Sequence, residues 1–137
     1  MQISDLGPSP EWGRILVAED SPMIAQMMRR SLLTRCALVD VVVDGRAAVR
    51  AALEGCLYNR PYAVVLMDMH MPVMNGASAI RALRQAEYRG VIIAVTAGDD
   101  EMHLRQALDA GADDFVIKPV EWSELYAKMR RLTGAGA

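Results

Sequence analysis

The clearest sign of chemistry in this sequence is one carboxylate, Asp68, which ends the uninterrupted apolar run A-V-V-L-M. Such a run is typical of a strand buried on both faces of a parallel sheet, so a charged side chain is expected at its carboxyl end. Pro72 and Asn75-Gly76 then indicate a loop that leads into a helix. Taken alone, Asp68 has a second explanation, because an aspartate after a strand often only caps the next turn.

Three further polar positions also follow apolar runs: Glu19-Asp20 after R-I-L-V-A, Thr96 after V-I-I-A-V, and Lys118 after F-V-I. If these runs are parallel strands, their carboxyl ends share one edge of the sheet, where open α/β sheets bind ligands. Three carboxylates, one hydroxyl and one ammonium group would then converge on a single pocket, although they span about a hundred residues. A cap for one turn does not explain such a set.

The charge of this set favours a cation. Three carboxylates repel one another, and one lysine cannot neutralise them, whereas a hard divalent ion with oxygen ligands such as Mg²⁺ can. A metal beside a carboxylate, with an ammonium and a hydroxyl opposite, suits a phosphoryl group, since phosphoryl transfer depends on positioning and charge neutralisation. Asp68 would attack directly, without a histidine base.

The elements that must position these groups alternate along the chain. Apolar strands are each followed by a segment with helical spacing, which predicts one α/β domain of five βα units: a parallel five-stranded sheet with right-handed crossovers and helices on both faces, in three layers. The expected strands are Arg14–Ala18, Leu38–Val43, Ala63–Met67, Val91–Val95 and Phe115–Ile117. Asp44, after the second strand, is expected to cap a helix rather than join the pocket, and Gly98-Asp99-Asp100 is expected to open the fourth helix.

Composition excludes several classes of function. The net charge of −2 argues against a nucleic-acid-binding surface in this domain. No apolar run approaches the roughly 18 residues that span a membrane, and Met1–Gly13 does not resemble a secretory signal. Cys36 and Cys56 lie far apart without a C-x-x-C spacing, each at the end of a predicted helix, which indicates reduced thiols in a cytoplasmic protein.

From about Arg14 to Leu132 the chain resembles the receiver domain of two-component response regulators. The matching motifs are I-L-V-A-E-D-S-P, V-L-M-D-M-H-M-P-V-M-N-G, A-V-T-A and A-G-A-D-D-F-V-I-K-P, in this order. The resemblance implies a flavodoxin-like sheet in the order 2-1-3-4-5. The second motif looks most like receivers of hybrid sensor histidine kinases. We expect a flexible leader at 1–13, the receiver domain at 14–132 and a tail at 133–137.

The resemblance also implies roles for the metal-binding side of the pocket. Asp68 would be the phospho-accepting aspartate and, with Asp20, a Mg²⁺ ligand. Glu19 would bind the ion directly or through water, and the backbone carbonyl of His70 would add a ligand. The His70 side chain either faces solvent or reaches the phosphoryl group and its attacking water; no metal role is expected for the imidazole.

On the other side of the pocket the resemblance implies a switch. Thr96 would be the switch hydroxyl and Lys118 the phosphate-binding lysine. Phe115 would be the switch aromatic, which turns inward when Thr96 moves toward the phosphoryl group. The Lys118-Pro119 peptide bond is expected to be cis.

The function that follows is a phosphorylation switch, not a classical enzyme: a histidine kinase or histidine phosphotransfer protein would phosphorylate Asp68, and the domain would assist its own phosphorylation and dephosphorylation. The alternative is a Mg²⁺-dependent aspartyl-phosphate phosphatase of the haloacid dehalogenase type. That family places its nucleophile after the first strand, with a second Asp two residues later, whereas Asp68 follows the third strand and His70 stands at the second position.

The faces of the fourth and fifth helices leave two interpretations open. They would form a homodimer or output surface, or they would simply be solvated and charged. The residues concerned are His103, Arg105, Glu121, Glu124 and Tyr126.

Overall fold

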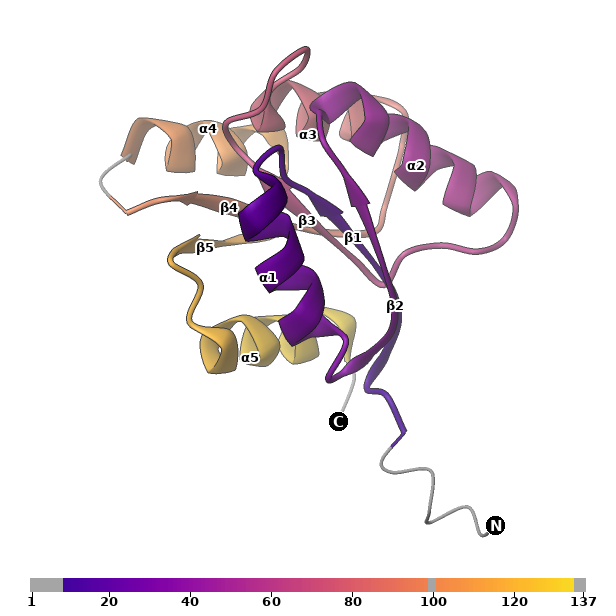
Figure 1. The fold of residues 1–137 in the computed structure, drawn as a ribbon. Coiled ribbons are helices and arrows are strands. Elements are labelled where there is room, and N and C mark those ends of the chain that lie inside the picture. The colour runs from indigo at the N-terminus through magenta and orange to yellow at the C-terminus, as the bar shows by residue number, and fades with distance from the viewer. Residues whose placement is uncertain (1–8, 99–100, 135–137) are drawn as a thin grey trace, which may run out of the picture.

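The structure is a computed structural model that describes residues 9–98 and 101–134. Most of the expected leader (1–8), most of the expected tail (135–137) and Asp99–Asp100, where the fourth helix was expected to begin, lie outside the described residues. The described chain alternates strands and helices in the predicted order (Figure 1): β1 Trp12–Ala18, α1 Pro22–Leu32, β2 Cys36–Val42, α2 Gly45–Leu57, β3 Val64–Asp68, α3 Gly76–Gln85, β4 Val91–Ala97, α4 Glu101–Ala110, β5 Asp114–Lys118 and α5 Trp122–Thr133.

The strands form one parallel sheet in the order β2-β1-β3-β4-β5, which confirms the predicted flavodoxin-like topology. The helices α2, α3 and α4 cover one face of the sheet, and α1 and α5 cover the other (Figure 1). Because successive side chains of a strand point to opposite faces, Leu16 and Val65 pack in the first layer while Ile15 and Val64 pack in the second. All four side chains are fully buried, and each such burial contributes about 1.5–3 kcal/mol.

Helix starts follow from local side-chain hydrogen bonds. Ser21, Asp44 and Asn75 have extended backbones, and each accepts a hydrogen bond from the backbone N–H three residues later. These bonds satisfy donors that the first helical turn leaves unpaired. Asp44 therefore caps α2, as expected, and lies outside the acidic cluster described below.

The first strand begins two residues earlier than the apolar pattern predicts. Trp12 is only 4% exposed and stacks on Tyr126 with 6.1 Å between ring centres, and its indole N–H donates to Thr133 Oγ1 at 3.0 Å. Glu11 next to it pairs with Arg35 and Arg130. These partners come from distant parts of the chain, and Gly13 interrupts the apolar run, so the pattern alone could not show this start.

Two expectations about side chains are wrong. Tyr126 does not belong to an exposed face of α5: it is 6% exposed, and its hydroxyl donates to the Ser31 carbonyl on the α1 side of the sheet. Cys36 begins β2 instead of ending a helix. Burial raises the pKa of its thiol to about 11, whereas Cys56 is exposed; both thiols are free. Within the described residues, the helices are too short or too polar to cross a membrane.

Candidate functional site

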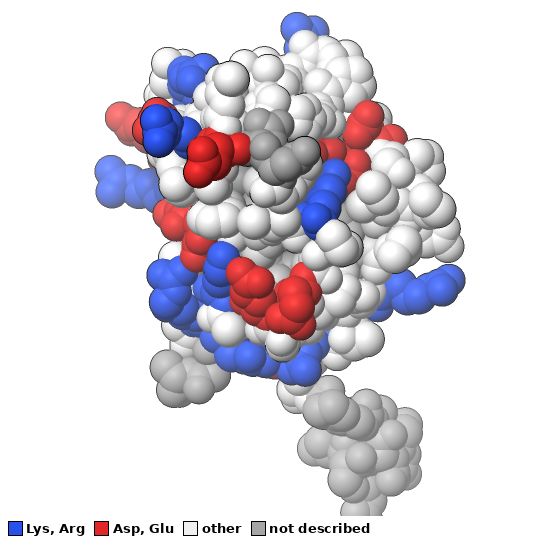
Figure 2. Space-filling model, turned by 90° about the vertical axis from the view of Figure 1, so that its left-hand side faces the viewer, with Lys and Arg blue, Asp and Glu red and all other residues white. Residues whose placement is uncertain are grey.

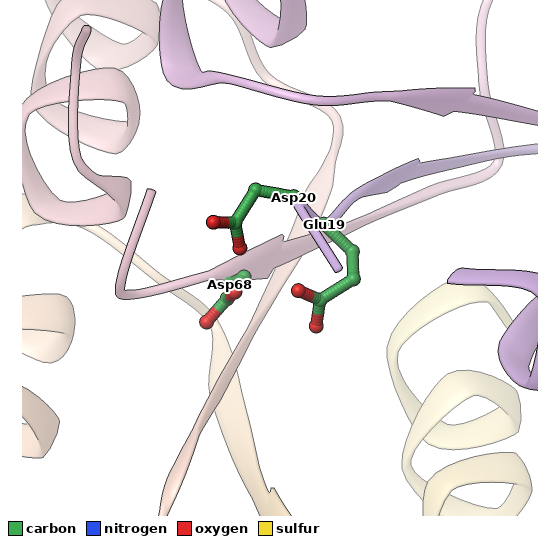
Figure 3. Close-up of side chains that lie close together, drawn as sticks. All are labelled: Glu19, Asp20 and Asp68. Atoms are coloured by element: carbon green, nitrogen blue, oxygen red, sulfur yellow. The ribbon is translucent and has the colours of Figure 1, made fainter. Parts of the chain in front are cut away.

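Three carboxylates meet at the carboxyl edge of the sheet, between the ends of β1 and β3 (Figure 3). One oxygen from each of Glu19, Asp20 and Asp68 lies within 4.8 Å of the other two. Glu19 and Asp68 are 2% and 3% exposed, and Asp20 is exposed. Buried carboxylates are rare unless they are paired or bind a metal, so this arrangement marks a site rather than a solvated acidic surface.

Lys118, the last residue of β5, supplies positive charge to the cluster. Its ammonium nitrogen lies 2.9 Å from Glu19 Oε1 and 3.3 Å from Asp68 Oδ1, so it bridges the ends of β1 and β3. Burial lowers the pKa of Lys118, but the hydrogen bond to Glu19 and the charge of Asp68 outweigh this effect, and the net pKa is raised above its ordinary value. Lys118 therefore carries a full positive charge at neutral pH. The bond to Pro119 is cis, as expected.

The loop after β3 wraps closely around Asp68. The backbone N–H of His70 donates to Asp68 Oδ1 at 3.1 Å, and the start of α3 passes so near that a Cβ on Gly76 would lie 2.3 Å from the Asp68 carbonyl oxygen. Gly45 donates its N–H to the Met74 carbonyl at 2.9 Å, and a Cβ there would lie 2.2 Å from the same oxygen. Both glycines let helix starts support this loop, a role that the sequence did not reveal although each glycine directly follows a helix cap.

Thr96 lies one residue before the end of β4, on the strand next to β3. The residue is 1% exposed, and its hydroxyl has no hydrogen-bond partner among the described residues. A buried hydroxyl without a partner costs about 1–3 kcal/mol. The hydroxyl is therefore a donor available to a ligand or to a rearranged state.

His70 lies on the exposed rim of the site and meets a residue that the sequence did not connect with it. Its ring lies edge-on to that of His103 in α4, with 4.2 Å between ring centres. The contact links the loop after β3 to α4. His103 was expected on a dimer or solvated face of the helix, and no motif placed it beside His70.

Phe115 stands in β5, three residues before Lys118, and is half-buried against the core layer under α3 and α4. In the register of β4 and β5, Ala94 pairs with Phe115 and Thr96 with Ile117. Paired and alternate residues point to the same face, so Thr96 and Phe115 are neighbours on one face of the sheet.

The donor set fits a hard divalent cation. The cluster offers carboxylate oxygens from two adjacent strand ends, which is the ligand type that Mg²⁺ prefers. Lys118 balances one of its three negative charges, which leaves an excess that matches a doubly charged ion.

The comparisons agree with this geometry. A flavodoxin-like fold with an acidic pocket and a lysine at the carboxyl edge of its sheet defines an α/β protein with places for a cation and an anion. The family model described as response regulator receiver domain matches residues 15–130. The chain therefore belongs to the response regulator receiver domain family.

Relatives of known sequence and structure give the same result. The transcriptional regulatory protein TcrA of Mycobacterium tuberculosis is 35% identical over 123 residues, which make up 90% of this chain and 47% of TcrA. A second relative is the receiver domain of sensor histidine kinase PA1611 from Pseudomonas aeruginosa, which was crystallised with a magnesium ion coordinated in its active-site cleft. It is 34% identical to this chain with a TM-score of 0.77, and the match covers 89% of this chain and 98% of that domain.

The receiver domain of the Arabidopsis thaliana histidine kinase CKI1, complexed with Mg²⁺ and BeF₃⁻, is 26% identical with a TM-score of 0.75, covering 86% of this chain and 89% of that one. The chain spans about half or less of the length of the curated relatives it matches. The alternative of a haloacid-dehalogenase-type phosphatase is not favoured, because Asp68 ends β3 and the family match covers nearly the whole chain.

Proposed function

We propose that Asp68 accepts a phosphoryl group from the phosphohistidine of a histidine kinase or a histidine phosphotransfer protein. A carboxylate oxygen of Asp68 would form the new bond to phosphorus as the phosphorus–nitrogen bond to the donor breaks, leaving the electron pair on the imidazole. The observation that supports this assignment is that buried Asp68 ends β3, the central strand of the sheet, where the N–H of His70 and the ammonium of Lys118 both contact its carboxylate.

We further propose that Glu19, Asp20, Asp68 and the backbone carbonyl of His70 hold Mg²⁺. When bound, the ion would neutralise charge on the incoming phosphoryl oxygens. Lys118 would neutralise a second oxygen from the opposite side, which requires its ammonium to leave Glu19 or share it. Because Glu19 has the longer acidic side chain, it suits a contact to the metal either directly or through water.

The switch would operate through Thr96 and Phe115. The unpartnered Thr96 hydroxyl would donate to a phosphoryl oxygen, and its movement would change the space beside its neighbour Phe115 on the same face of the sheet. Phosphorylation would thus alter the surface near β5 and α4. The same groups would assist dephosphorylation by admitting water to the phosphoryl group.

The wider setting is also part of the proposal. We place the domain in the cytoplasm, in keeping with its two free thiols. The side of the molecule that carries α4 and α5 presents acidic and basic side chains next to one another (Figure 2), so a homodimer through this face would rest on charge pairing. Relatives include both transcriptional regulators and receivers of histidine kinases, so attachment to a hybrid kinase stays a prediction.

The test uses a small phosphodonor, acetyl phosphate, and intact-mass measurement. The wild-type chain should gain one phosphoryl group in Mg²⁺ and none in EDTA, and Asp68→Asn should gain none. Asp44→Asn is the matched control: it removes a carboxylate that follows β2 at the same edge, keeps a good helix cap, and leaves the cluster intact. An adduct on Asp68→Asn, or equal labelling without Mg²⁺, would overturn the proposal.

A further inference from the structure

Lys128, in α5, contacts Phe115 at two points. Its ammonium nitrogen lies 4.6 Å from the centre of the Phe115 ring, and it donates a hydrogen bond to the Phe115 carbonyl oxygen at 2.5 Å. The Lys128 side chain is only 18% exposed. A cation held over an aromatic face is attracted to it, and the attraction grows as the cation loses water.

Other groups fix the ammonium in place. It pairs with Glu124 Oε1 at 3.2 Å and with Asp114 Oδ1 at 3.4 Å. Together with the Phe115 carbonyl, these acceptors match the three N–H donors of a lysine. Asp114 is itself held by Arg131 and accepts from the Phe115 N–H at 2.8 Å. The ammonium therefore stays over β5 whether or not the ring remains beneath it.

The ring is the movable partner in this contact. Phe115 is half-buried and is a neighbour of Thr96 on the same face of the sheet. If the ring turns away from its present position, it loses the cation and the ammonium gains nothing in return. The contact with Lys128 therefore favours the orientation of Phe115 that is seen here over any turned orientation.

We propose that Lys128 is a positioning residue that holds Phe115 in its present orientation and thereby sets how readily the domain switches. This inference rests on the proposed function, in which Phe115 turns on phosphorylation. Cation–π contacts at partly exposed sites correspond to roughly a two- to fivefold change in an equilibrium ratio. Removing the cation should shift the ratio of turned to present orientation upward by about that factor.

The chain offers a direct readout because Phe115 is its only phenylalanine. Protein made with ¹³C-labelled phenylalanine gives ring NMR signals from this residue alone. The wild type would be measured free and with Mg²⁺ and beryllofluoride, to give the ring chemical shifts of the unswitched and the switched state. In free Lys128→Met the ring signals should move part of the way toward those of the switched state, and the beryllofluoride concentration for half-saturation should fall about two- to fivefold.

Three variants separate the cation from structural effects. Lys128→Arg keeps a cation over the ring and should restore wild-type signals. Lys128→Gln keeps a donor for the carbonyl without the charge, so it should behave as Lys128→Met and serves if the latter is poorly folded. Arg131→Met removes another partner of Asp114; among the described residues the cation over the ring is that of Lys128 and not of Arg131, so this variant should stay near wild type.

The idea is refuted if Lys128→Met and Lys128→Gln leave the ring signals and the beryllofluoride response unchanged, or if Arg131→Met shifts them equally. Intact mass after acetyl phosphate treatment is recorded on the same samples. Failure of the wild type to take up a phosphoryl group would count against the proposed function, whereas the ring signals of the free proteins still decide whether Lys128 holds Phe115.

Discussion

Removing the charge of Asp20 should stabilise the metal-free protein while it weakens the metal site. Asp20 is exposed at the rim of the cluster, and one of its oxygens lies within 4.8 Å of oxygens of Glu19 and Asp68. Lys118 pairs with those two carboxylates. Asp20 therefore adds negative charge beside two like charges, and Asp20→Asn keeps its shape without that repulsion.

The size of the effect follows from Coulomb's law. At 4.8 Å two unit charges repel by roughly 0.9 kcal/mol at the dielectric constant of water and by roughly 3.5 kcal/mol at an effective value near 20. Asp20 is exposed, so the lower figure governs each of its two pairs, and rotation of the side chain away from its neighbours reduces their sum. Lys118 offsets part of the negative charge of Glu19 and Asp68, so we expect Asp20→Asn to raise the free energy of unfolding by about 1 kcal/mol at low ionic strength.

The assay is urea unfolding in EDTA, followed by tryptophan fluorescence, since Trp12 and Trp122 both pack against Tyr126. Added salt should reduce the difference in unfolding free energy between Asp20→Asn and the wild type, because it screens the repulsion between the carboxylates. In Mg²⁺ at about 100 times the Kd, the wild type should gain about 2.7 kcal/mol and the variant far less, so that the order of stability reverses. Asp44→Asn should stay near wild type throughout. The reasoning is refuted if Asp20→Asn is no more stable than wild type in EDTA at low salt.

Three further predictions concern stability. Arg84→Met should lower the free energy of unfolding in urea by roughly 2–4 kcal/mol and leave acetyl phosphate labelling unchanged. The Arg84 guanidinium joins the turns that precede β4 and β5, because it donates to three backbone carbonyls and pairs with Asp113. Val73→Asn should stabilise the protein by about 0.5–1 kcal/mol, since Val73 has a φ of 68° and is exposed; an equal or lower midpoint would contradict this. Hydrogen bonds from Arg130 and Arg35 lower the pKa of Glu11 to about 2, from an ordinary 4.5, so its contribution is complete above pH 4.5 and is lost as pH falls toward 2. When the free energy of unfolding is measured against pH, Glu11→Gln should lose the part of the pH dependence that Glu11 causes between pH 4.5 and 2. A profile equal to that of the wild type would exclude this role of Glu11.

Much of the fold could be read from local sequence. Apolar runs of strand length alternate with helical spacing, and both patterns depend only on residues a few positions apart. The same holds for the caps: Ser21, Asp44 and Asn75 bond to backbone N–H groups three residues away. The sheet order came from the family resemblance, and the structure confirms it.

Boundaries and exposure depended on distant partners. Trp12 is held in β1 by a hydrogen bond from its indole to Thr133, the last residue of α5, which lies 121 residues away in the sequence. Tyr126 was placed on a charged face by its neighbours in sequence, yet its ring is buried between Trp12 and Trp122. A stretch that mixes polar and aromatic residues does not show which side of its helix meets the sheet.

The sequence by itself determined the kinds of groups at the site, because polar residues that end apolar strands of a parallel sheet must share one edge. Only the tertiary structure decided how these groups meet: that Lys118 bridges Glu19 and Asp68, that His70 lies against His103, and that Lys128 covers Phe115. The physical reason is that local patterns follow from backbone geometry over a few residues, whereas contacts between remote side chains depend on how strands and helices pack.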